Sequence, residues 1–405
     1  MGFISDNFKR KQNKPVAYLK NYNLKTFAAN PVTKHDIKGV HYKKGENWRD
    51  NYYALTKEVL IKDFGLMKEI GINTIQFSGG NIYDHNLLKY SEQFDLKVIY
   101  EFGIDNSMDF INGRENLNSI REEIITEVKN LKGNQTIIGY SFKYALGDHF
   151  TKPLLFDQQT AYLNWLYSLT SEIKSIDPRK SLIVELHLNL ESINTMNYIR
   201  KNLPIDSYVL LVNDPMQLDE VLAFTKNNEI SVFISNIKPE IFAGNTEKFK
   251  NLEIIMANWQ DERRSNRLTF DGLLDFNGDK RQIFGNLKNI WTKYKEEIGD
   301  QKVKILKTSE PIFPGRDFKY FAVLFIDNKW TQIPNSKKNY HFEWNLVKKD
   351  LFGNPLALKL VGTGAELNLK IPEDYQHYDL LLIAKNKASG DVLRSKTILN
   401  TPTQH

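Results

Sequence analysis

The chain has 405 residues, of which 41% are hydrophobic, 12% aromatic and 26% charged. This balance is typical of globular domains and excludes disordered, collagen-like and coiled-coil chains. The net charge of +6 comes from 55 basic and 49 acidic residues, so it gives little support for a nucleic-acid partner. No apolar run approaches ~20 residues, so the sequence predicts no membrane span.

Cysteine is absent from the chain. Disulfide scaffolds, zinc ribbons, thiol nucleophiles and iron–sulfur clusters are therefore excluded. Lys9, Arg10, Lys11 and Lys14 resemble the basic start of a signal peptide, but no apolar region follows them. The localisation stays open, because the chain could be cytoplasmic or a piece of a longer, membrane-anchored protein. The sequence predicts no cofactor.

Three regions follow one another along the chain, beginning with a polar, basic extension at residues 1–36. From 37 to 298, short apolar runs alternate with amphipathic helical stretches. The runs lie at 37–42, 72–78, 97–103, 136–142, 181–188, 207–213, 230–235 and 252–259. The clearest helical stretches lie at 56–71, 121–133, 159–178 and 218–228. Near-continuous apolar runs are typical of strands buried on both faces of a parallel sheet, so the pattern predicts a (β/α)8 TIM barrel.

Two further patterns complete the predicted architecture. The first apolar run is followed by HYKKGENW, which lacks the Gly-rich turn of a dinucleotide-binding sheet. From 302 to 401, short alternating strands are separated by turn formers such as PGRD, PNSKKN and ASGD. This switch to a period of two predicts a C-terminal β-sandwich of immunoglobulin or fibronectin type.

In a TIM barrel the functional site lies at the carboxyl ends of the strands. We therefore expect a substrate to meet the polar and aromatic side chains at these ends. They are His41, Tyr83, Glu101, Tyr144, Asp148, His149, His187, Asn213, Asn236, Trp259 and Asp261. Aromatic rings stack on the apolar faces of pyranoses, and carboxylates and amides bind hydroxyl groups. The set favours an oligo- or polysaccharide, with Trp259 as the stacking ring.

Simpler interpretations of three of these positions stay open. Glu101 could pair with a Lys or Arg inside the barrel, His187 could be a core histidine, and Trp259 could serve packing alone. Glu185 and His187 could approach Asp148 and His149, but this spacing matches no metal-binding motif, so no metal site is predicted.

Several segments, in the right order, resemble the barrel of clan A glycoside hydrolases of the β-galactosidase and β-glucuronidase type. They are IKGVHY, DFGLMKEIGINTIQFS and YSEQFDLKVIYEFG, then NWQDE followed by FDGLLDFNGDKRQIFGNLKNIW. The resemblance covers residues 37–292. It implies a retaining mechanism with two glutamates about 5–5.5 Å apart, an acid/base after the fourth strand and a nucleophile at the end of the seventh.

The chain departs from this family at both catalytic positions. The resemblance places Ala145 at the acid/base, Asn236 at the nucleophile, and Gln76 at an arginine of the second strand. Ala cannot transfer a proton and Asn is a poor nucleophile, so we expect no hydrolysis by the usual retaining route.

Three functions remain as hypotheses. The first is a carbohydrate-binding barrel with a degenerate catalytic pair, acting as an accessory module in polysaccharide synthesis, export or recognition. The second is an active glycoside hydrolase that uses relocated carboxylates, Asp148 and Glu101. The third is a structural scaffold that binds no sugar.

Overall fold

The structure is a computed structural model of the whole chain. It describes residues 36–44, 55–80, 82–105, 108–143, 156–264, 267–293, 301–307, 312–326, 329–332, 339–374 and 377–399. Contacts between residues divide the described part of the chain into two compact units. One comprises 1–37, 74–237 and 252–255, and the other 38–73, 238–251 and 256–405. The expected extension 1–36 lies outside the described residues except for Asp36, and the domain boundaries at 298 and 302 stay predictions.

Eight strands form a closed barrel in chain order, which confirms the predicted TIM barrel. They are β1 (Lys38–His41), β2 (Thr74–Ser78), β3 (Lys97–Gly103), β4 (Ile137–Lys143), β5 (Ser181–His187), β6 (Ser207–Leu211), β7 (Val232–Ile237) and β8 (Ile254–Met256). The pairs from β2 to β7 are parallel. Inside the barrel, a cluster of buried apolar side chains includes Ile99, Ile183, Val209 and Phe233.

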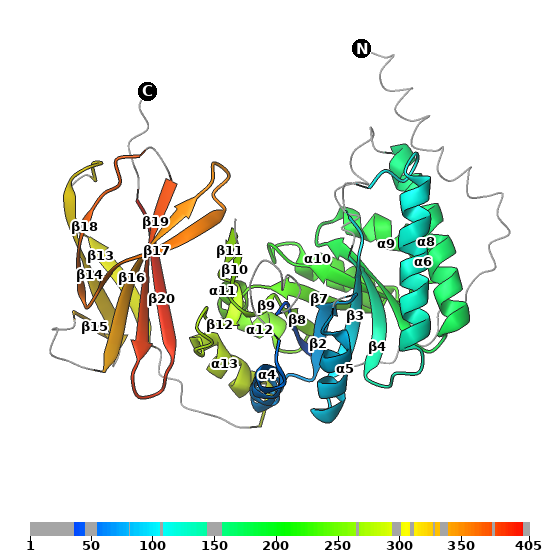
Figure 1. The fold of residues 1–405 in the computed structure, drawn as a ribbon, viewed down its shortest axis with the longest axis horizontal. Helices are drawn as coiled ribbons and strands as arrows, with labels where there is room; N and C mark the ends of the chain where they lie inside the picture. The colour runs from blue at the N-terminus through cyan, green and yellow to red at the C-terminus, as the bar shows by residue number, and fades with distance from the viewer. Residues whose placement is uncertain are drawn as a thin grey trace, which may run out of the picture. The chain divides into compact units, whose positions relative to one another are not determined.

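Helices follow most of the barrel strands (Figure 1). They are α4 (Lys57–Glu69), α5 (Asp84–Gln93), α6 (Arg114–Leu131), α8 (Phe156–Ile176), α9 (Glu191–Asn202), α10 (Leu218–Asn227), α11 (Pro239–Gly244), α12 (Thr246–Phe249) and α13 (Gln282–Trp291). Local sequence sets the ends of α4. Thr56 caps its first turn by accepting a hydrogen bond from the Val59 amide, and Gly71 follows its end with a φ of 83°. The four helical stretches expected from periodicity correspond to α4, α6, α8 and α10.

The last predicted barrel run, 252–259, is divided in the structure. β8 ends at Met256, and β9 (Asn258–Gln260) leaves the barrel to pair in parallel with β12 (Gly272–Leu274). Between them, β10 (Glu262–Arg264) and β11 (Arg267–Thr269) form an antiparallel pair. The second half of the expected strand therefore belongs to a small additional sheet, which precedes α13 in the chain.

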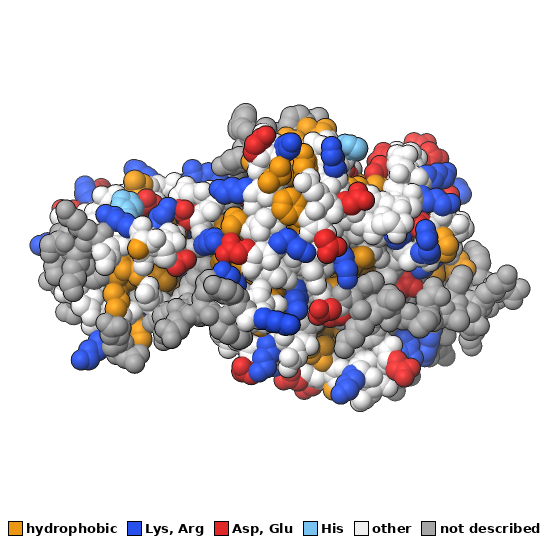
Figure 2. Space-filling view, turned by 90° about the horizontal axis from the view of Figure 1, so that it is seen from below, with side chains coloured by type: hydrophobic (Ala, Val, Ile, Leu, Met, Phe, Trp, Pro, Cys, Tyr) orange, Lys and Arg blue, Asp and Glu red, His pale blue; other side chains and the backbone are white. Residues whose placement is uncertain are grey.

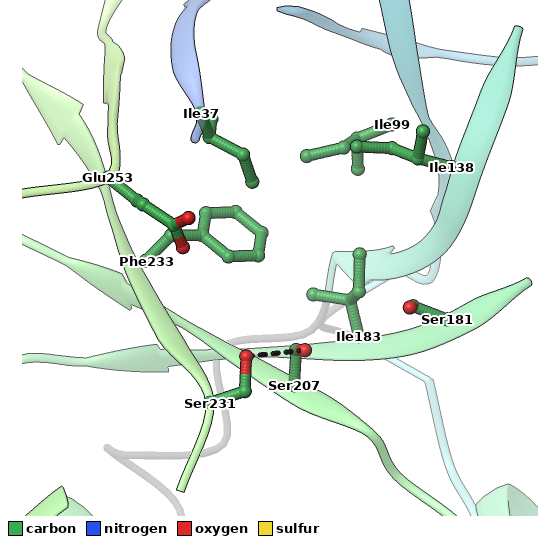
Figure 3. A pocket seen from close by; sticks show the side chains of 9 residues that line it. All are labelled: Ile37, Ile99, Ile138, Ser181, Ile183, Ser207, Ser231, Phe233 and Glu253. Carbon is green, nitrogen blue, oxygen red and sulfur yellow. Dashed lines mark hydrogen bonds between the residues drawn. The ribbon is translucent and has the colours of Figure 1, made fainter. Parts of the chain in front are cut away.

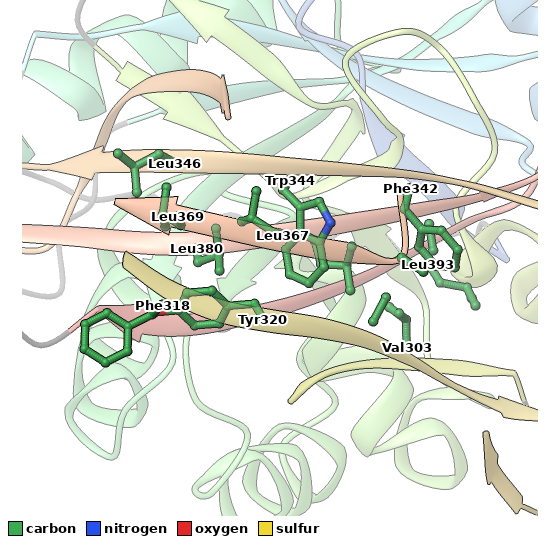
Figure 4. Packing of buried hydrophobic residues seen from close by; sticks show 14 of the residues in the cluster. Val303, Phe318, Tyr320, Phe342, Trp344, Leu346, Leu367, Leu369, Leu380 and Leu393 are labelled. Atoms are coloured by element: carbon green, nitrogen blue, oxygen red, sulfur yellow. The ribbon is translucent and has the colours of Figure 1, made fainter. Parts of the chain in front are cut away.

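The C-terminal region contains two four-stranded sheets that form the predicted β-sandwich. Their strands are β13 (Lys302–Lys307), β14 (Asp317–Ile326), β15 (Lys329–Gln332), β16 (Tyr340–Lys349), β17 (Pro355–Thr363), β18 (Glu366–Lys370), β19 (His377–Asn386) and β20 (Val392–Leu399). β14 pairs with β13, β15 and β18, and the second sheet runs β17-β16-β19-β20. Figure 4 shows the side chains between the sheets, with Trp344 and Tyr320 among them. The buried Trp344 indole donates a hydrogen bond to the Gly364 carbonyl at 2.8 Å.

The surface is mixed in charge. On the face drawn in Figure 2, Lys and Arg side chains alternate with Asp and Glu and do not gather into one continuous stripe. No helix among the described residues is long and apolar enough to cross a membrane.

Candidate functional site

Two buried glutamates meet inside the barrel through one amide. Gln76 on β2 donates from its Nε2 to Glu101 Oε2 on β3 at 2.6 Å and to Glu185 Oε1 on β5 at 2.9 Å. The side chains come from alternating positions of their strands, which point into the barrel. Because one nitrogen serves both oxygens, these oxygens lie no more than 5.5 Å apart, the sum of the two distances.

Serine hydroxyl groups complete the surroundings of this pair. Ser78 donates to Glu101 Oε1 at 2.7 Å, and Ser141 donates to Glu185 Oε1 at 3.4 Å. Glu101 is 1% exposed and Glu185 is 3% exposed. Burial of charge is tolerated where hydrogen bonds replace water, so Gln76 and the two serines stabilise a polar layer inside an otherwise apolar barrel.

Above this layer, three expected site residues follow neighbouring strands. His187 ends β5 and is half-buried, Asn213 follows β6 and is exposed, and Asn236 lies in β7 and is half-buried. The Asn236 amide donates to Asn213 Oδ1 at 3.4 Å. Asn236 has a φ of 59°, a left-handed conformation that Asn adopts more readily than most residues. His187 lies two residues beyond Glu185 on the same strand face, so these side chains occupy the carboxyl-end rim and the glutamates the layer below it.

The end of β3 leaves space at the same rim. Gly103 is exposed and lies two residues beyond Glu101, on the same face of the strand. Among the described residues, no atom lies within 4 Å of a methyl group added at Gly103. The described side chains therefore leave room beside the end of β3.

The loop after β2, which carries Tyr83, is fixed by hydrogen bonds from buried groups. The Tyr100 hydroxyl donates to Asp84 Oδ2 at 2.5 Å, and the Gly80 amide donates to the same carboxylate at 2.7 Å. Burial and the adjacent Asp84 raise the pKa of Tyr100 well above its ordinary value, so the phenol stays a donor. Tyr83 itself is half-buried at the start of α5.

Trp259 is not an open stacking surface, which corrects the expectation from the sequence. It is 1% exposed, and its ring centroid lies 6.3 Å from that of Phe284 on α13. The physical reason is the break after β8, because β9 pairs with β12 and turns the indole toward this helix. The packing interpretation holds for Trp259.

Asp261 is likewise engaged within the protein and is no free ligand for sugar. Its side chain is fully buried, pairs with Arg394 of β20, and lies 3.9 Å from the Arg281 guanidinium. The Gly272 amide donates to its Oδ1 at 2.9 Å. This expectation is also corrected, because the carboxylate is buried and already engaged by Arg394 and the Gly272 amide.

The remaining expected residues divide into two groups. His41 is described and buried in β1. Tyr144, Asp148 and His149 lie outside the described residues, as does Ala145. Within the described part of the chain, no group of three or more His, Asp or Glu side chains could hold a metal ion.

From the sequence alone, Gln76 was expected only as a replaced arginine, and Ser141 was not among the expected site residues. Alternation along 72–78 and 136–142 indicates that Gln76 and Ser141 face into the barrel. Their partner Glu185, however, lies 109 residues from Gln76 and 44 residues from Ser141 in the chain. No local signal connects residues so far apart in the chain.

A pocket lies at the opposite end of the barrel, where the strands begin. Figure 3 shows Ile99, Ile183 and Phe233 directed into it and a hydrogen bond of 2.9 Å between Ser207 and Ser231. Most of its lining is apolar or engaged within the protein. Because the residues at this end of a TIM barrel serve stability, we do not assign the function there.

Comparison with solved structures finds glycosidases among the proteins of similar fold. A β-glucuronidase from Bacteroides uniformis matches 92% of this chain over 46% of its own, with a TM-score of 0.47 and 14% identity. The match to the β-D-glucuronidase for Dictyoglomus thermophilum covers 64% of this chain and 51% of that protein, with a TM-score of 0.47 and 16% sequence identity. The match to a β-galactosidase from the psychrophilic Marinomonas ef1 covers 62% of this chain and 58% of that protein, with a TM-score of 0.46 and 10% sequence identity. No protein-family model and no curated protein sequence matches the chain.

The structures returned are of the type that the sequence resembles. The chain spans about half the length of these proteins. The expected resemblance to clan A glycoside hydrolases is confirmed as a likeness of fold. At these identities, conclusions about function depend on the side chains of the site itself.

Proposed function

We propose that the chain is a glycoside-hydrolase-like barrel that binds carbohydrate and does not hydrolyse it by the usual retaining route. One observation carries the proposal. At the end of β7, where the resemblance implies a nucleophilic carboxylate, the side chain is the amide of Asn236, hydrogen-bonded to the amide of Asn213. A primary amide is no nucleophile for an anomeric carbon, whereas it both donates to and accepts from hydroxyl groups.

The rim offers the chemistry that a sugar requires. Asn213, Asn236 and His187 present amide and imidazole groups on three consecutive strand ends. Gly103 leaves open space at the end of β3. Convergent polar groups around open space are typical of sites that recognise a small ligand.

The buried glutamates support binding rather than chemistry. Glu101 and Glu185 accept hydrogen bonds from Gln76, Ser78 and Ser141 and expose almost no surface. A general acid must come within hydrogen-bond reach of the glycosidic oxygen. In the position described, both carboxyl groups are occupied one layer below the rim.

The biological role that we propose is that of an accessory module in polysaccharide synthesis, export or recognition. The partner would be an oligo- or polysaccharide, and the chain could belong to a larger, membrane-anchored protein.

Titration calorimetry against a panel of β-linked oligosaccharides tests the proposal. Asn236→Ala and Asn213→Ala each remove hydrogen-bonding groups worth about 0.5–1.5 kcal/mol, so each should weaken binding by about two- to tenfold. Asn118→Ala removes an amide from the exposed surface of α6 and should leave the affinity unchanged. If no oligosaccharide binds the unaltered chain, the scaffold hypothesis replaces the proposal.

An active hydrolase is a second candidate, favoured by the separation of the buried pair. The two oxygens that Gln76 bridges, Glu101 Oε2 and Glu185 Oε1, lie no more than 5.5 Å apart, which is compatible with the 5–5.5 Å of retaining enzymes. Asp148 was the partner expected for Glu101. Assays with aryl β-glycosides distinguish the candidates. Turnover by the unaltered chain that is abolished in Glu101→Gln or Asp148→Asn would establish the hydrolase and reject the binding-only proposal.

A further inference from the structure

The sheet formed by β13, β14, β15 and β18 has one face in the sandwich core and one facing away from it. Tyr320, Ala322 and Leu324 of β14 belong to the core cluster, with Tyr320 among the side chains in Figure 4. Side chains alternate along a strand, so Val323 and Phe325 lie on the other face. This face carries apolar groups where a solvent-facing sheet ordinarily carries polar ones.

Strand register arranges the outer face into cross-strand rows. Lys302, Phe325 and Trp330 form one row across β13, β14 and β15, and Lys304, Val323 and Gln332 form the next. Directly opposed residues of antiparallel strands share a face. We call Lys302, Lys304, Phe325 and Trp330 the Trp330 face.

The aromatic and basic groups of the Trp330 face contact one another. The rings of Phe325 and Trp330 have centroids 5.3 Å apart and planes inclined at 56°. The Lys302 ammonium lies 5.6 Å from the Phe325 ring centroid, and the Lys304 ammonium lies 5.8 Å from the Trp330 ring centroid. Lys304 belongs to β13 and Trp330 to β15, so the lysine side chain crosses β14 above Val323. Val323 is buried although it faces away from the core.

The indole remains accessible in this arrangement. Trp330 is 48% exposed, in contrast to Trp344 of the core, which has no exposed surface. A large exposed aromatic side chain beside two cations is characteristic of a binding surface rather than of packing. The charges favour an anionic partner, and the ring offers a flat apolar surface on which a sugar can stack.

We propose that the Trp330 face binds an anionic polysaccharide, with one uronic-acid ring stacked on Trp330 and its carboxylate held by Lys304 and Lys302. The charge complementarity comes from the face itself, whereas the choice of a glycan over another polyanion rests on the proposed function of the barrel. The site is separate from the amide rim formed by Asn213 and Asn236. It gives the sandwich a binding role of its own.

Calorimetry with oligogalacturonate and with its methyl ester tests the charge and the ring separately. Trp330→Ala should weaken oligogalacturonate binding by about tenfold, a loss comparable to one buried aromatic contact. Lys304→Gln should weaken it several-fold, and added salt should weaken binding to the unaltered chain. The uncharged ester should bind more weakly and should not distinguish Lys304→Gln from the unaltered chain.

Matched controls lie on the second sheet of the sandwich. Ile398 is 61% exposed on β20, and Lys359 is exposed on β17, so Ile398→Ala and Lys359→Gln remove the same kinds of group elsewhere. Both should leave the affinity unchanged. Three outcomes would each overturn the inference. The affinity could be unchanged in Trp330→Ala and Lys304→Gln, the control variants could lose as much affinity as these two, or oligogalacturonate could fail to bind the unaltered chain.

Two further measurements separate this inference from the function of the barrel. Asn236→Ala should leave oligogalacturonate binding at the Trp330 face intact, so loss in that variant alone would reject the sandwich site while supporting the rim. The chain could instead bind single-stranded DNA or vesicles containing phosphatidylserine, lose that binding in Trp330→Ala, and fail to bind oligogalacturonate. This result would assign the Trp330 face to another polyanion and overturn the proposal of a glycan ligand.

Discussion

Gln76 holds two buried carboxyl groups with a single amide nitrogen. Its Nε2 donates to Glu101 and Glu185, while its own Oε1 is buried and finds no hydrogen-bond partner among the described residues. An amide in this position satisfies both acids at the expense of its carbonyl group. We interpret Gln76 as the residue that keeps the polar layer of the barrel in place beneath the rim.

Replacing Gln76 should therefore cost more than replacing one serine. Gln76→Leu keeps most of the volume and removes donors from two buried acids, so the free energy of unfolding should fall by about 2–4 kcal/mol. Ser78→Ala removes one donor from Glu101 and should cost about 1–2 kcal/mol. Urea denaturation at neutral pH measures both, and a Gln76→Leu chain as stable as the unaltered one would show that the bridge contributes nothing.

At the scale of elements, the segment between β3 and α6 is tied to α8 by side chains. Asp109 accepts hydrogen bonds from the amides of Ile111 and Asn112, at 2.9 and 3.0 Å. Gln158 of α8 donates to Asp109 Oδ1 at 2.6 Å and accepts from the Phe110 amide at 2.7 Å. The hydrogen bond from the Asn112 backbone, followed by that from Gln158, holds the pKa of Asp109 well below its ordinary value.

This lowered pKa makes the contribution of Asp109 depend on pH in a defined direction. In the unfolded chain the carboxyl group titrates near pH ~3.9, whereas in the folded chain it stays ionised to lower pH. Its stabilisation is therefore fully present above about pH 4 and is lost as the pH falls through the folded pKa. Asp109→Asn cannot show this loss.

Urea denaturation of both chains between pH 3 and pH 7 measures the effect. The stability difference between the unaltered chain and Asp109→Asn should be constant near neutral pH and should shrink below about pH 4. Other carboxyl groups titrate alike in both chains and cancel in the comparison. Parallel stability curves over the whole range would contradict the assignment of the lowered pKa to Asp109.

At the scale of the whole molecule, buried charges join the β9–β12 segment to the sandwich. Asp261 lies between Arg394 of β20 and Arg281, and Arg281 also donates to the Phe270 and Gly272 carbonyls. Burial raises the pKa of Asp261, while the two arginines oppose this shift. The ion pair with Arg394 favours the charged form of the carboxylate.

Removing one member of this pair should be costly and removing both should be less so. Arg394→Met leaves the Asp261 carboxylate buried without its nearest cation, so the free energy of unfolding should fall by about 3–5 kcal/mol. Asp261→Asn combined with Arg394→Met should recover part of the loss, because no buried charge then lacks its partner. A double-mutant cycle by chemical denaturation measures the coupling. Additive effects of the two substitutions would refute the pairing.

How much the sequence could predict differs between the fold and the site. Amphipathic periodicity predicted a helix at 56–71, which corresponds to α4, because a helix depends on neighbouring residues. The site needed partners that lie far apart in the chain. Trp259 shows the difference, since its apolar run was evident but its direction depended on the pairing of β9 with β12.

The sequence by itself determined the alternation of barrel strands with helices and the switch from buried parallel strands to alternating ones near residue 300. These are properties of composition and of local period, and burial of apolar side chains fixes them without reference to distant partners. Only the tertiary structure decided that Gln76 bridges Glu101 and Glu185, that Asp261 pairs with Arg394, and that Trp330 is exposed whereas Trp259 is buried. Hydrogen bonds and ion pairs form between whichever polar groups the closed barrel and the paired sheets bring within about 3 Å, and that selection depends on the path of the whole chain.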